Sequence, residues 1–125
     1  MNVPSNLKYT KSDEWFDPST GAVGITDFAQ SQLSDIVFIE LLVDEGEEVT
    51  VGKAIASVES VKASAEIYAP VAGKVSAINK GLSDKPETLN SDPFGEGWMI
   101  KVEGGTTGDV MDSAAYEADC AGRAH

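Results

Sequence analysis

Residues 58–75 read VESVKASAEIYAPVAGKV. Apolar side chains alternate with polar ones on both sides of Lys62, a spacing typical of β-strands with one buried face. The residues nearest to the lysine are small, namely Ser60, Ala63, Ser64 and Ala65. We therefore predict a β-hairpin with its tip at residues 60–63, from which an exposed Lys62 side chain projects away from the body of the protein.

The segments before and after this tip resemble each other. Residues 46–60 read GEEVTVGKAIASVES and residues 65–79 read AEIYAPVAGKVSAIN. Gly52 lies ten residues before Lys62 and Gly73 eleven residues after it, so we expect turns that bracket the lysine almost symmetrically. Residues 46–79 are therefore predicted to form one central hairpin unit.

Outside this hairpin unit, most of the chain is predicted to form short strands. Residues 14–16 and 22–25 are expected to pair as a hairpin, and the apolar run at 36–41 is expected to be a buried strand. Acidic residues around Gly46 and the GEGW sequence at 95–98 are interpreted as turns, the second one ahead of a strand. This pattern predicts a single, mainly β domain over residues 1–125, built as a sandwich or barrel.

Two helices complete the predicted domain. Thr26 is a good N-cap for a short helix that ends near Leu33, with Phe28, Ala29 and Leu33 facing the core. A second helix is predicted over residues 109–122 and is expected to pack on the sheet. Its expected apolar stripe consists of Val110, Ala114, Ala115 and Ala118, with Met111 and Tyr116 beside it.

Charge limits the classes of partner. The chain carries 21 acidic and nine basic side chains, giving a net charge of −12 and a pI near 4.2. Such a surface repels nucleic-acid phosphates and anionic membranes, and it suits partners that present basic patches. No apolar run approaches the roughly 20 residues that span a bilayer. We therefore predict a soluble protein that binds neither nucleic acid nor membrane.

The residue types that most enzymes use are nearly absent. Cys120 is the only cysteine and His125 the only histidine, so neither a nucleophile–histidine pair nor a zinc ligand set can be assembled in the interior. The acidic run at 44–48 lacks the spacing of a calcium loop. The sequence therefore predicts a protein that is not an enzyme acting alone and that binds no metal, with Cys120 as a small residue of the second helix.

Several ordered blocks carry a resemblance to a known family. ESVKA at 59–63 and IYAPVAGKV at 67–75 resemble the lipoyl-attachment hairpin of the glycine cleavage system H proteins. Further blocks resemble this family over nearly the whole chain: LKYTKSDEW at 7–15, VGITDFAQSQLSDIVFIELL at 23–42, NSDPFGEGWMIKV at 90–102 and MDSAAYEA at 111–118. The resemblance implies a lipoyl/biotinyl-type barrel-sandwich hybrid, or hammerhead, with both predicted helices.

The resemblance also implies roles for single residues. Lys62 matches the lysine that carries covalently attached lipoate, the expected cofactor. Glu59 matches the acidic position read by lipoylating enzymes, and Gly73 matches the glycine that shapes the return strand. Asp13 departs from the family pattern, which has His-Glu-Trp where this chain has Asp-Glu-Trp.

The implied function is that of a shuttle. Lipoyl-Lys62 would carry an aminomethyl group from the pyridoxal-phosphate enzyme glycine decarboxylase to the aminomethyltransferase, and dihydrolipoyl dehydrogenase would reoxidise the arm. We expect a monomer in the bacterial cytoplasm rather than the mitochondrial matrix, because no transit peptide is visible. We also expect a cleft for the loaded arm between the hairpin, the helix after Thr26 and residues 82–90.

Three alternatives remain open at this stage. A biotin carrier has methionines beside its lysine, whereas Val61 and Ala63 stand here. A lipoyl domain of an oxo-acid dehydrogenase has Asp before the lysine and is tethered to further domains. An H-like protein that relays lipoyl groups to other carriers shares the fold, and its discriminating test is whether the loaded protein supports glycine cleavage.

Overall fold

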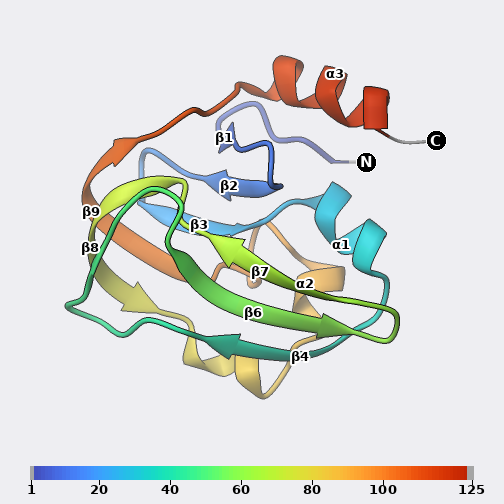
Figure 1. Cartoon of the computed structure of the whole chain (residues 1–125), viewed down its shortest axis with the longest axis horizontal. Helices are drawn as coiled ribbons and strands as arrows, with labels where there is room; N and C mark the ends of the chain where they lie inside the picture. The colour runs from blue at the N-terminus through green and yellow to red at the C-terminus, as the bar shows by residue number, and fades with distance from the viewer. Residues whose placement is uncertain (1, 124–125) are drawn as a thin grey trace.

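A computed structural model describes residues 2–123 and shows two β-sheets packed around a common core (Figure 1). The larger sheet has the strand order β1-β2-β3-β9-β8-β5, and the smaller has the order β4-β6-β7. The strands are β1 (Lys8–Tyr9), β2 (Glu14–Phe16), β3 (Ala22–Ile25), β4 (Ile36–Leu41), β5 (Glu48–Val49), β6 (Ala54–Ser60), β7 (Ser64–Tyr68), β8 (Val71–Ile78) and β9 (Ile100–Thr107). The helices are α1 (Asp27–Leu33), the 3₁₀-helix η1 (Lys80–Ser83), α2 (Thr88–Ser91) and α3 (Ser113–Arg123).

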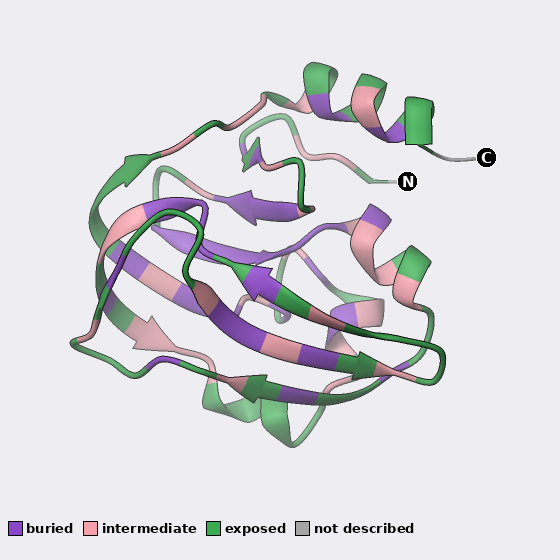
Figure 2. Cartoon of the chain, in the orientation of Figure 1, coloured by how far each residue is buried: buried purple, intermediate pink, exposed green. Residues whose placement is uncertain are grey.

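The main core lies between the two sheets. Val58 of β6 and Ile39 of β4 pack with Val23 and Ile100 of the larger sheet, and all four are at most 1% exposed. Burying an aliphatic side chain of this size contributes about 1.5–3 kcal/mol to folding. Figure 2 shows the resulting pattern, in which the strands alternate between buried and more exposed residues while the hairpin end stays open to solvent.

Several predicted elements are confirmed. Strands β2 and β3 pair as an antiparallel hairpin, with Trp15 opposite Gly24. The Thr26 hydroxyl accepts a hydrogen bond of 3.1 Å from the backbone N–H of Ala29, which caps α1 as expected. Phe28 is buried, and the other two residues expected to face the core, Ala29 and Leu33, are partly buried against it.

The strand predicted at 36–41 is confirmed with the same bounds, but the prediction that it is buried holds only in part. In β4, Val37 is 54% exposed and Phe38 is 49% exposed, whereas Ile36 and Ile39 are buried. A shift of register between Ile36 and Phe38 inserts an extra residue into β4. The side chains of the apolar run therefore cannot all point to the buried face of the sheet. The smaller sheet also has only one face against the core, and its outer face meets solvent.

The C-terminal helix differs from the prediction in its start and its buried face. Helix α3 begins at Ser113 rather than 109, because Met111 pairs in an extended conformation with Tyr9. The stripe predicted from alanines is wrong, since residues 114, 115 and 118 are exposed. Tyr116 and Cys120, one turn apart, are buried instead, and the Tyr116 ring stacks on Tyr9 with centroids 4.7 Å apart. An aromatic ring buries far more apolar surface than alanine, so it decides which face docks.

Gly52 and Gly73 play different structural roles. Gly52 lies in the expected turn with a φ of +89°, which glycine adopts at little cost. Gly73, also predicted at a turn, lies instead within β8 opposite Val49. A Cβ atom at this position would sit 2.5 Å from the carbonyl oxygen of Glu103 on β9. Close packing between β8 and β9 therefore requires glycine at residue 73.

No helix among residues 2–123 combines the length and the apolar character needed to cross a membrane. His125, which the sequence placed at the chain end, lies outside the described residues.

Candidate functional site

The hairpin tip is held by its own backbone. Strands β6 and β7 pair up to Glu59 and Ser64, and the N–H of Ser60 donates to the carbonyl oxygen of Ala63 at 2.8 Å. The Ser60 hydroxyl oxygen accepts from the N–H groups of Lys62 at 3.3 Å and Ala63 at 3.1 Å. The turn closed by these bonds lies at residues 60–63, where the sequence predicted the tip of the hairpin.

A further contact anchors the tip to the body. The N–H of Val61 donates to the carbonyl oxygen of Asp35, just before β4, at 3.0 Å. The Val61 side chain is 66% exposed, and Lys62 beside it is exposed as well. Within the described part of the chain, the ion pairs join Lys53 to Glu47 and Arg123 to two aspartates, and none involves Lys62. Its amine is therefore accessible to a modifying enzyme.

The other two predicted site residues lie at different places. Glu59 is exposed on β6 between Phe38 and Ser64 of the neighbouring strands, next to the tip. Gly73 lies in the other sheet and does not belong to the tip. The structure therefore brings Glu59 and Lys62 together and separates Gly73 from both.

A hollow of about 430 Å³ lies at the base of the hairpin, at the end opposite the tip. Segments far apart in the sequence line it: Thr10, Lys11, Ser12, Glu14, Val51, Gly52, Tyr68, Ala69, Pro70 and Asp109. The segment between β1 and β2 supplies hydroxyl groups and the amine of Lys11, and the carboxylates come from Glu14 of β2 and Asp109 after β9. Apolar surface comes from the turns that flank the hairpin. This combination suits a ligand with an apolar chain and a polar or cationic end.

Glu14 is the buried charged residue of this hollow. It is 1% exposed, yet its carboxylate accepts hydrogen bonds from the hydroxyls of Thr10 and Ser12, the latter at 2.6 Å. The backbone N–H of Tyr68 donates to Oε2 of Glu14 at 3.2 Å. Burial raises the pKa of the Glu14 carboxyl above its ordinary 4.5, although the hydrogen bonds from Ser12, Thr10 and Tyr68 lower it.

Sequence reasoning missed Glu14 as a site residue. The available signal was a glutamate directly before two large aromatic residues, Trp15 and Phe16, in a strand whose three residues are all buried. A carboxylate in such a place needs polar partners, and these come from Thr10, Ser12 and a strand 54 residues away. The distant partner could not be read from the local sequence.

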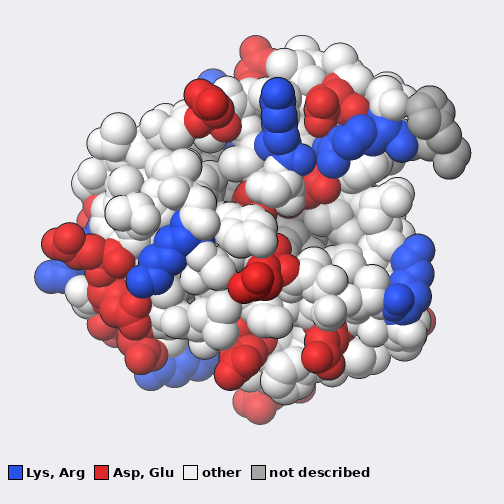
Figure 3. All heavy atoms as spheres, viewed as in Figure 1, with Lys and Arg blue, Asp and Glu red and all other residues white. Residues whose placement is uncertain are grey.

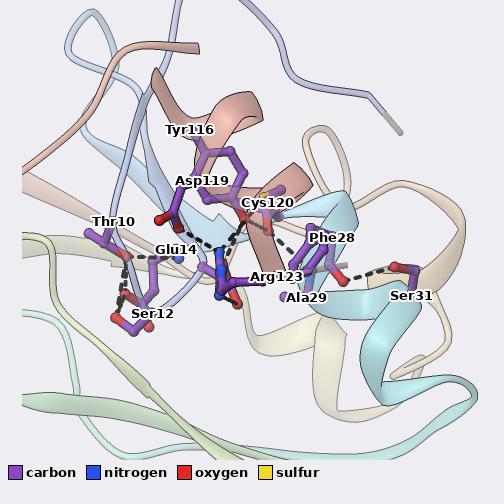
Figure 4. A network of polar contacts seen from close by, with 12 residues as sticks. Thr10, Ser12, Glu14, Phe28, Ala29, Ser31, Tyr116, Asp119, Cys120 and Arg123 are labelled. Atoms are coloured by element: carbon purple, nitrogen blue, oxygen red, sulfur yellow. Dashed lines mark hydrogen bonds and ion pairs between the residues drawn. The ribbon is translucent and has the colours of Figure 1, made fainter. Parts of the chain in front are cut away.

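Asp13 points away from this hollow, toward helix α3. Its carboxylate accepts from the guanidinium of Arg123 at 2.6 Å and from the hydroxyl of Tyr116 at 2.9 Å. Figure 4 shows Arg123 reaching from α3 toward the strand that carries Glu14. Asp13, which replaces the histidine of the family pattern, is therefore part of the contact between the two ends of the chain.

The cleft suggested between the hairpin, the helix after Thr26 and residues 82–90 stays a prediction. At the junction of α1, β4 and residues 82–90, the amide of Asn90 bonds to Gln30, Ser34 and Ile36 at 2.7–3.0 Å. A hollow of about 280 Å³ along residues 79–88 includes no residue of the hairpin tip or of α1. The hollow that contains Glu14 adjoins the hairpin at residues 68–70.

Comparison with known proteins identifies the family. The family model for the glycine cleavage H-protein matches residues 7–120. The chain belongs to this family. An H protein of Deinococcus deserti is 50% identical over 119 residues, which cover 94% of this chain and 98% of the relative. An H protein of Anaeromyxobacter sp. strain K is 49% identical over 123 residues, covering 94% of this chain and 95% of that one.

The fold of this H protein also matches a solved structure. The crystal structure of a glycine cleavage system H protein from Mycobacterium marinum superimposes with a TM-score of 0.86 at 32% identity, covering 93% of this chain and 97% of the other. The two sheets and the C-terminal helix agree with the predicted barrel-sandwich hybrid. The family match also places the chain outside the biotin carriers and the oxo-acid dehydrogenase lipoyl domains.

Proposed function

We propose that this H protein is the lipoyl-carrying shuttle of the glycine cleavage system, with lipoate joined to Nζ of Lys62 by an amide bond. The observation that carries the proposal is the exposed lysine at a tip whose backbone is fixed by Ser60 and Asp35, in a chain whose family match spans residues 7–120. The residues around Lys62 are small and mostly exposed, which leaves room for a modifying enzyme.

Lys62 supplies the attachment point, and the fold determines what the arm can reach. When bound, the lipoyl group supplies a disulfide that takes up the aminomethyl group left by glycine decarboxylation and is reduced in doing so. Acylation converts the Lys62 ammonium into a neutral amide, so the tip loses its positive charge. A fixed tip that carries a long flexible arm suits successive visits to several active sites.

We further propose that the hollow containing Glu14 receives the loaded end of the arm. Tyr68 lies six positions after Lys62, at the far end of β7, a distance of at most about 20 Å along an extended chain. This distance is comparable to the reach of a lysine side chain extended by an acyl chain. The loaded end carries an amine, and the Glu14 carboxylate is a suitable acceptor for an ammonium group. Val51 and Pro70 would cover the apolar part of the arm and exclude water.

Glu59 is proposed as a residue that lipoylating enzymes recognise. Its carboxylate is exposed three residues before Lys62, next to the exposed ring of Phe38 on β4. Gly73 would act only through the shape of β8, because it lies in the other sheet. A charged group beside an apolar ring offers an enzyme both a salt bridge and a hydrophobic contact close to the amine.

The proposed partners are glycine decarboxylase, the aminomethyltransferase, dihydrolipoyl dehydrogenase and the lipoylating enzymes. A net charge of −12 favours docking surfaces rich in lysine and arginine, and Figure 3 shows acidic side chains spread over one face of the molecule. We propose that the protein is a monomer. We also propose the cytoplasm as its location, because the relatives reported above come from bacteria.

Mass spectrometry tests the attachment directly. The protein is purified from cells able to lipoylate it, beside Lys62→Arg and the control Lys80→Arg, which changes another exposed lysine. We expect a lipoyl increment that maps to Lys62, disappears in Lys62→Arg and persists in the control. A biotin increment, or an unmodified folded protein in competent cells, would contradict the proposal.

A reconstitution separates glycine cleavage from lipoate relay. The lipoylated protein is mixed with glycine decarboxylase, the aminomethyltransferase and dihydrolipoyl dehydrogenase, and carbon dioxide release from glycine is followed over many turnovers. We expect turnover that depends on the H protein. Lipoyl transfer to other carriers without glycine turnover would assign the protein to the relay class.

A further inference from the structure

We propose that Arg123 is a positioning residue for the arm-binding hollow: through Asp13, it fixes the turn between β1 and β2 that presents Ser12 and Glu14. The inference rests on the proposed role of that hollow. It concerns a contact between residues 110 positions apart, one at each end of the chain.

The contact between Arg123 and Asp13 has two hydrogen bonds. Nη2 of Arg123 donates to Oδ1 of Asp13 at 2.6 Å, and Nη1 donates to Oδ2 at 3.2 Å. Tyr116, about two helical turns before Arg123, donates its hydroxyl to the same carboxylate at 2.9 Å. The Asp13 side chain is only 17% exposed, so these charge-assisted bonds are partly shielded from solvent.

Arg123 is itself held in place by two other elements. Its guanidinium lies 3.1 Å from a carboxylate oxygen of Asp119, one turn earlier on α3. It also lies over the ring of Phe28 on α1, with its Cζ atom 4.8 Å from the ring centroid. The guanidinium therefore reaches Asp13 from a defined position, and Figure 4 shows it between α3 and α1.

Asp13 adopts a backbone conformation that needs support. Its φ is +73°, in the left-handed region that is uncommon for residues other than glycine. Its carbonyl oxygen accepts from the N–H of Thr26 at 3.0 Å, and its own N–H donates to Thr10 at 3.2 Å. The direction in which the chain enters Glu14 depends on this conformation, because φ of Asp13 sets the orientation of the next peptide.

The turn behaves as one unit with two functional sides. The Thr10 N–H donates to the carbonyl oxygen of Glu14 at 3.0 Å, and the Thr10 and Ser12 hydroxyls donate to the Glu14 carboxylate. Asp13 points toward α3, while Glu14 lines the hollow. A displacement of Asp13 would therefore be passed directly to the Glu14 carboxylate.

The docking of helix α3 also rests on buried contacts that do not involve Arg123. Tyr116 stacks on Tyr9 in the interior, and Cys120 is 1% exposed. Removing the guanidinium should leave these buried contacts intact, while the carboxylates of Asp13 and Asp119 and the ring of Phe28 lose their contact with it. This separation makes the proposal testable in a folded variant.

The first measurement uses protein without lipoate. We compare the wild type with Arg123→Met by amide and carboxyl NMR. The matched control is Lys101→Met, which also loses one positive charge and a cation–π contact but does not line the hollow. We expect the amide resonances of Ser12 and Glu14 to shift in Arg123→Met only. The pKa of Glu14 should rise further there, because the neighbouring Asp13 charge is no longer neutralised.

The second measurement uses the lipoylated protein after glycine decarboxylase has released carbon dioxide from glycine and transferred the remaining aminomethyl group to the arm. The loaded protein is then separated from the enzyme. Release of ammonia and formaldehyde into water reports loss of protection. We expect release at least about threefold faster in Arg123→Met and in Glu14→Gln than in the wild type or Lys101→Met, since modest misplacement of a binding group has effects of this size or larger. Asp13→Asn, which tolerates the left-handed conformation but lacks the charge, should behave like Arg123→Met.

The outcomes separate the two proposals. Unchanged release in Glu14→Gln would overturn the assignment of the hollow, and with it this inference. Faster release in Glu14→Gln, together with unchanged resonances and release in Arg123→Met, would leave the hollow in place and show the Asp13–Arg123 contact to be a surface ion pair without a positioning role.

Discussion

The backbone N–H of Tyr68 donates a hydrogen bond of 3.2 Å to Oε2 of Glu14, which joins the hairpin strand β7 to strand β2 of the other sheet. A buried carboxylate therefore lies between the part of the molecule that carries Lys62 and the part that carries the N-terminal strands. Through this bond, the charge state of Glu14 can influence both the stability of the fold and the hollow at the base of the hairpin.

Glu14 should give the protein a specific pH dependence. Its pKa is raised in the folded state mainly by burial, above the ordinary value of 4.5. Between these two pKa values the folded protein binds a proton that the unfolded chain does not, so this group stabilises the fold at low pH and the stabilisation is lost as pH rises through the window. We expect the unfolding free energy of the wild type, relative to Glu14→Gln, to fall as pH rises above the ordinary carboxyl pKa of 4.5.

Denaturant unfolding at a series of pH values checks this prediction. Glu14→Gln removes the ionisable group and keeps nearly the same shape, so the difference between the two proteins isolates Glu14. A difference that instead grew as pH rises would mean that hydrogen bonding outweighs burial at this carboxylate.

Glu59 should affect modification without affecting stability. Glu59→Gln removes one exposed charge beside the tip, and we expect a lipoylation rate about tenfold lower, as for loss of a charged hydrogen bond. Glu66→Gln is the matched control, because it removes an exposed glutamate from the adjacent strand β7, where it faces Ser57. An equal decrease of the lipoylation rate in both variants would show that general acidity, not Glu59, is recognised.

Gly73 should be intolerant of a side chain. Gly73→Ala places a Cβ atom 2.5 Å from the Glu103 carbonyl oxygen and 2.7 Å from Cγ1 of Val102. We expect a loss of about 1–3 kcal/mol in the unfolding free energy, the usual cost of overpacking. The control is Gly122→Ala, where a Cβ meets no atom within 4 Å and a helix position favours alanine. Equal stability of the two variants would contradict the packing argument.

Thr26 should stabilise α1 through its hydroxyl. The hydroxyl accepts from the N–H of Ala29 and lies 2.7 Å from the hydroxyl of Tyr116. Thr26→Val keeps the shape but removes both contacts, and we expect a loss of about 1–2 kcal/mol in the unfolding free energy. Thr26→Ser keeps the cap and should lose less. Thermal unfolding of the wild type and both variants checks this order of stability. A Thr26→Val variant that is more stable than Thr26→Ser would contradict the prediction.

Much of the fold was readable because its signals are local. Alternating side chains around Lys62, small residues at the tip and turn residues between short runs predicted the hairpin at residues 60–63. The N-cap at Thr26 and the pair of strands β2 and β3 followed from the same kind of reasoning. Predictions failed where partners decide the outcome, as for the face of α3, which Tyr116 sets by stacking on Tyr9.

The sequence by itself determined the family, the mainly β architecture and the lysine at the exposed tip, because strand alternation, turn residues and motif spacing act between close neighbours in the chain. Only the tertiary structure decided that Glu14 lines a hollow with residues 51–52 and 68–70, and that Asp13 meets Arg123. These contacts join segments separated by tens of residues or more. Their physical cause is the packing of two sheets and a terminal helix, which fixes where each polar side chain can find a partner.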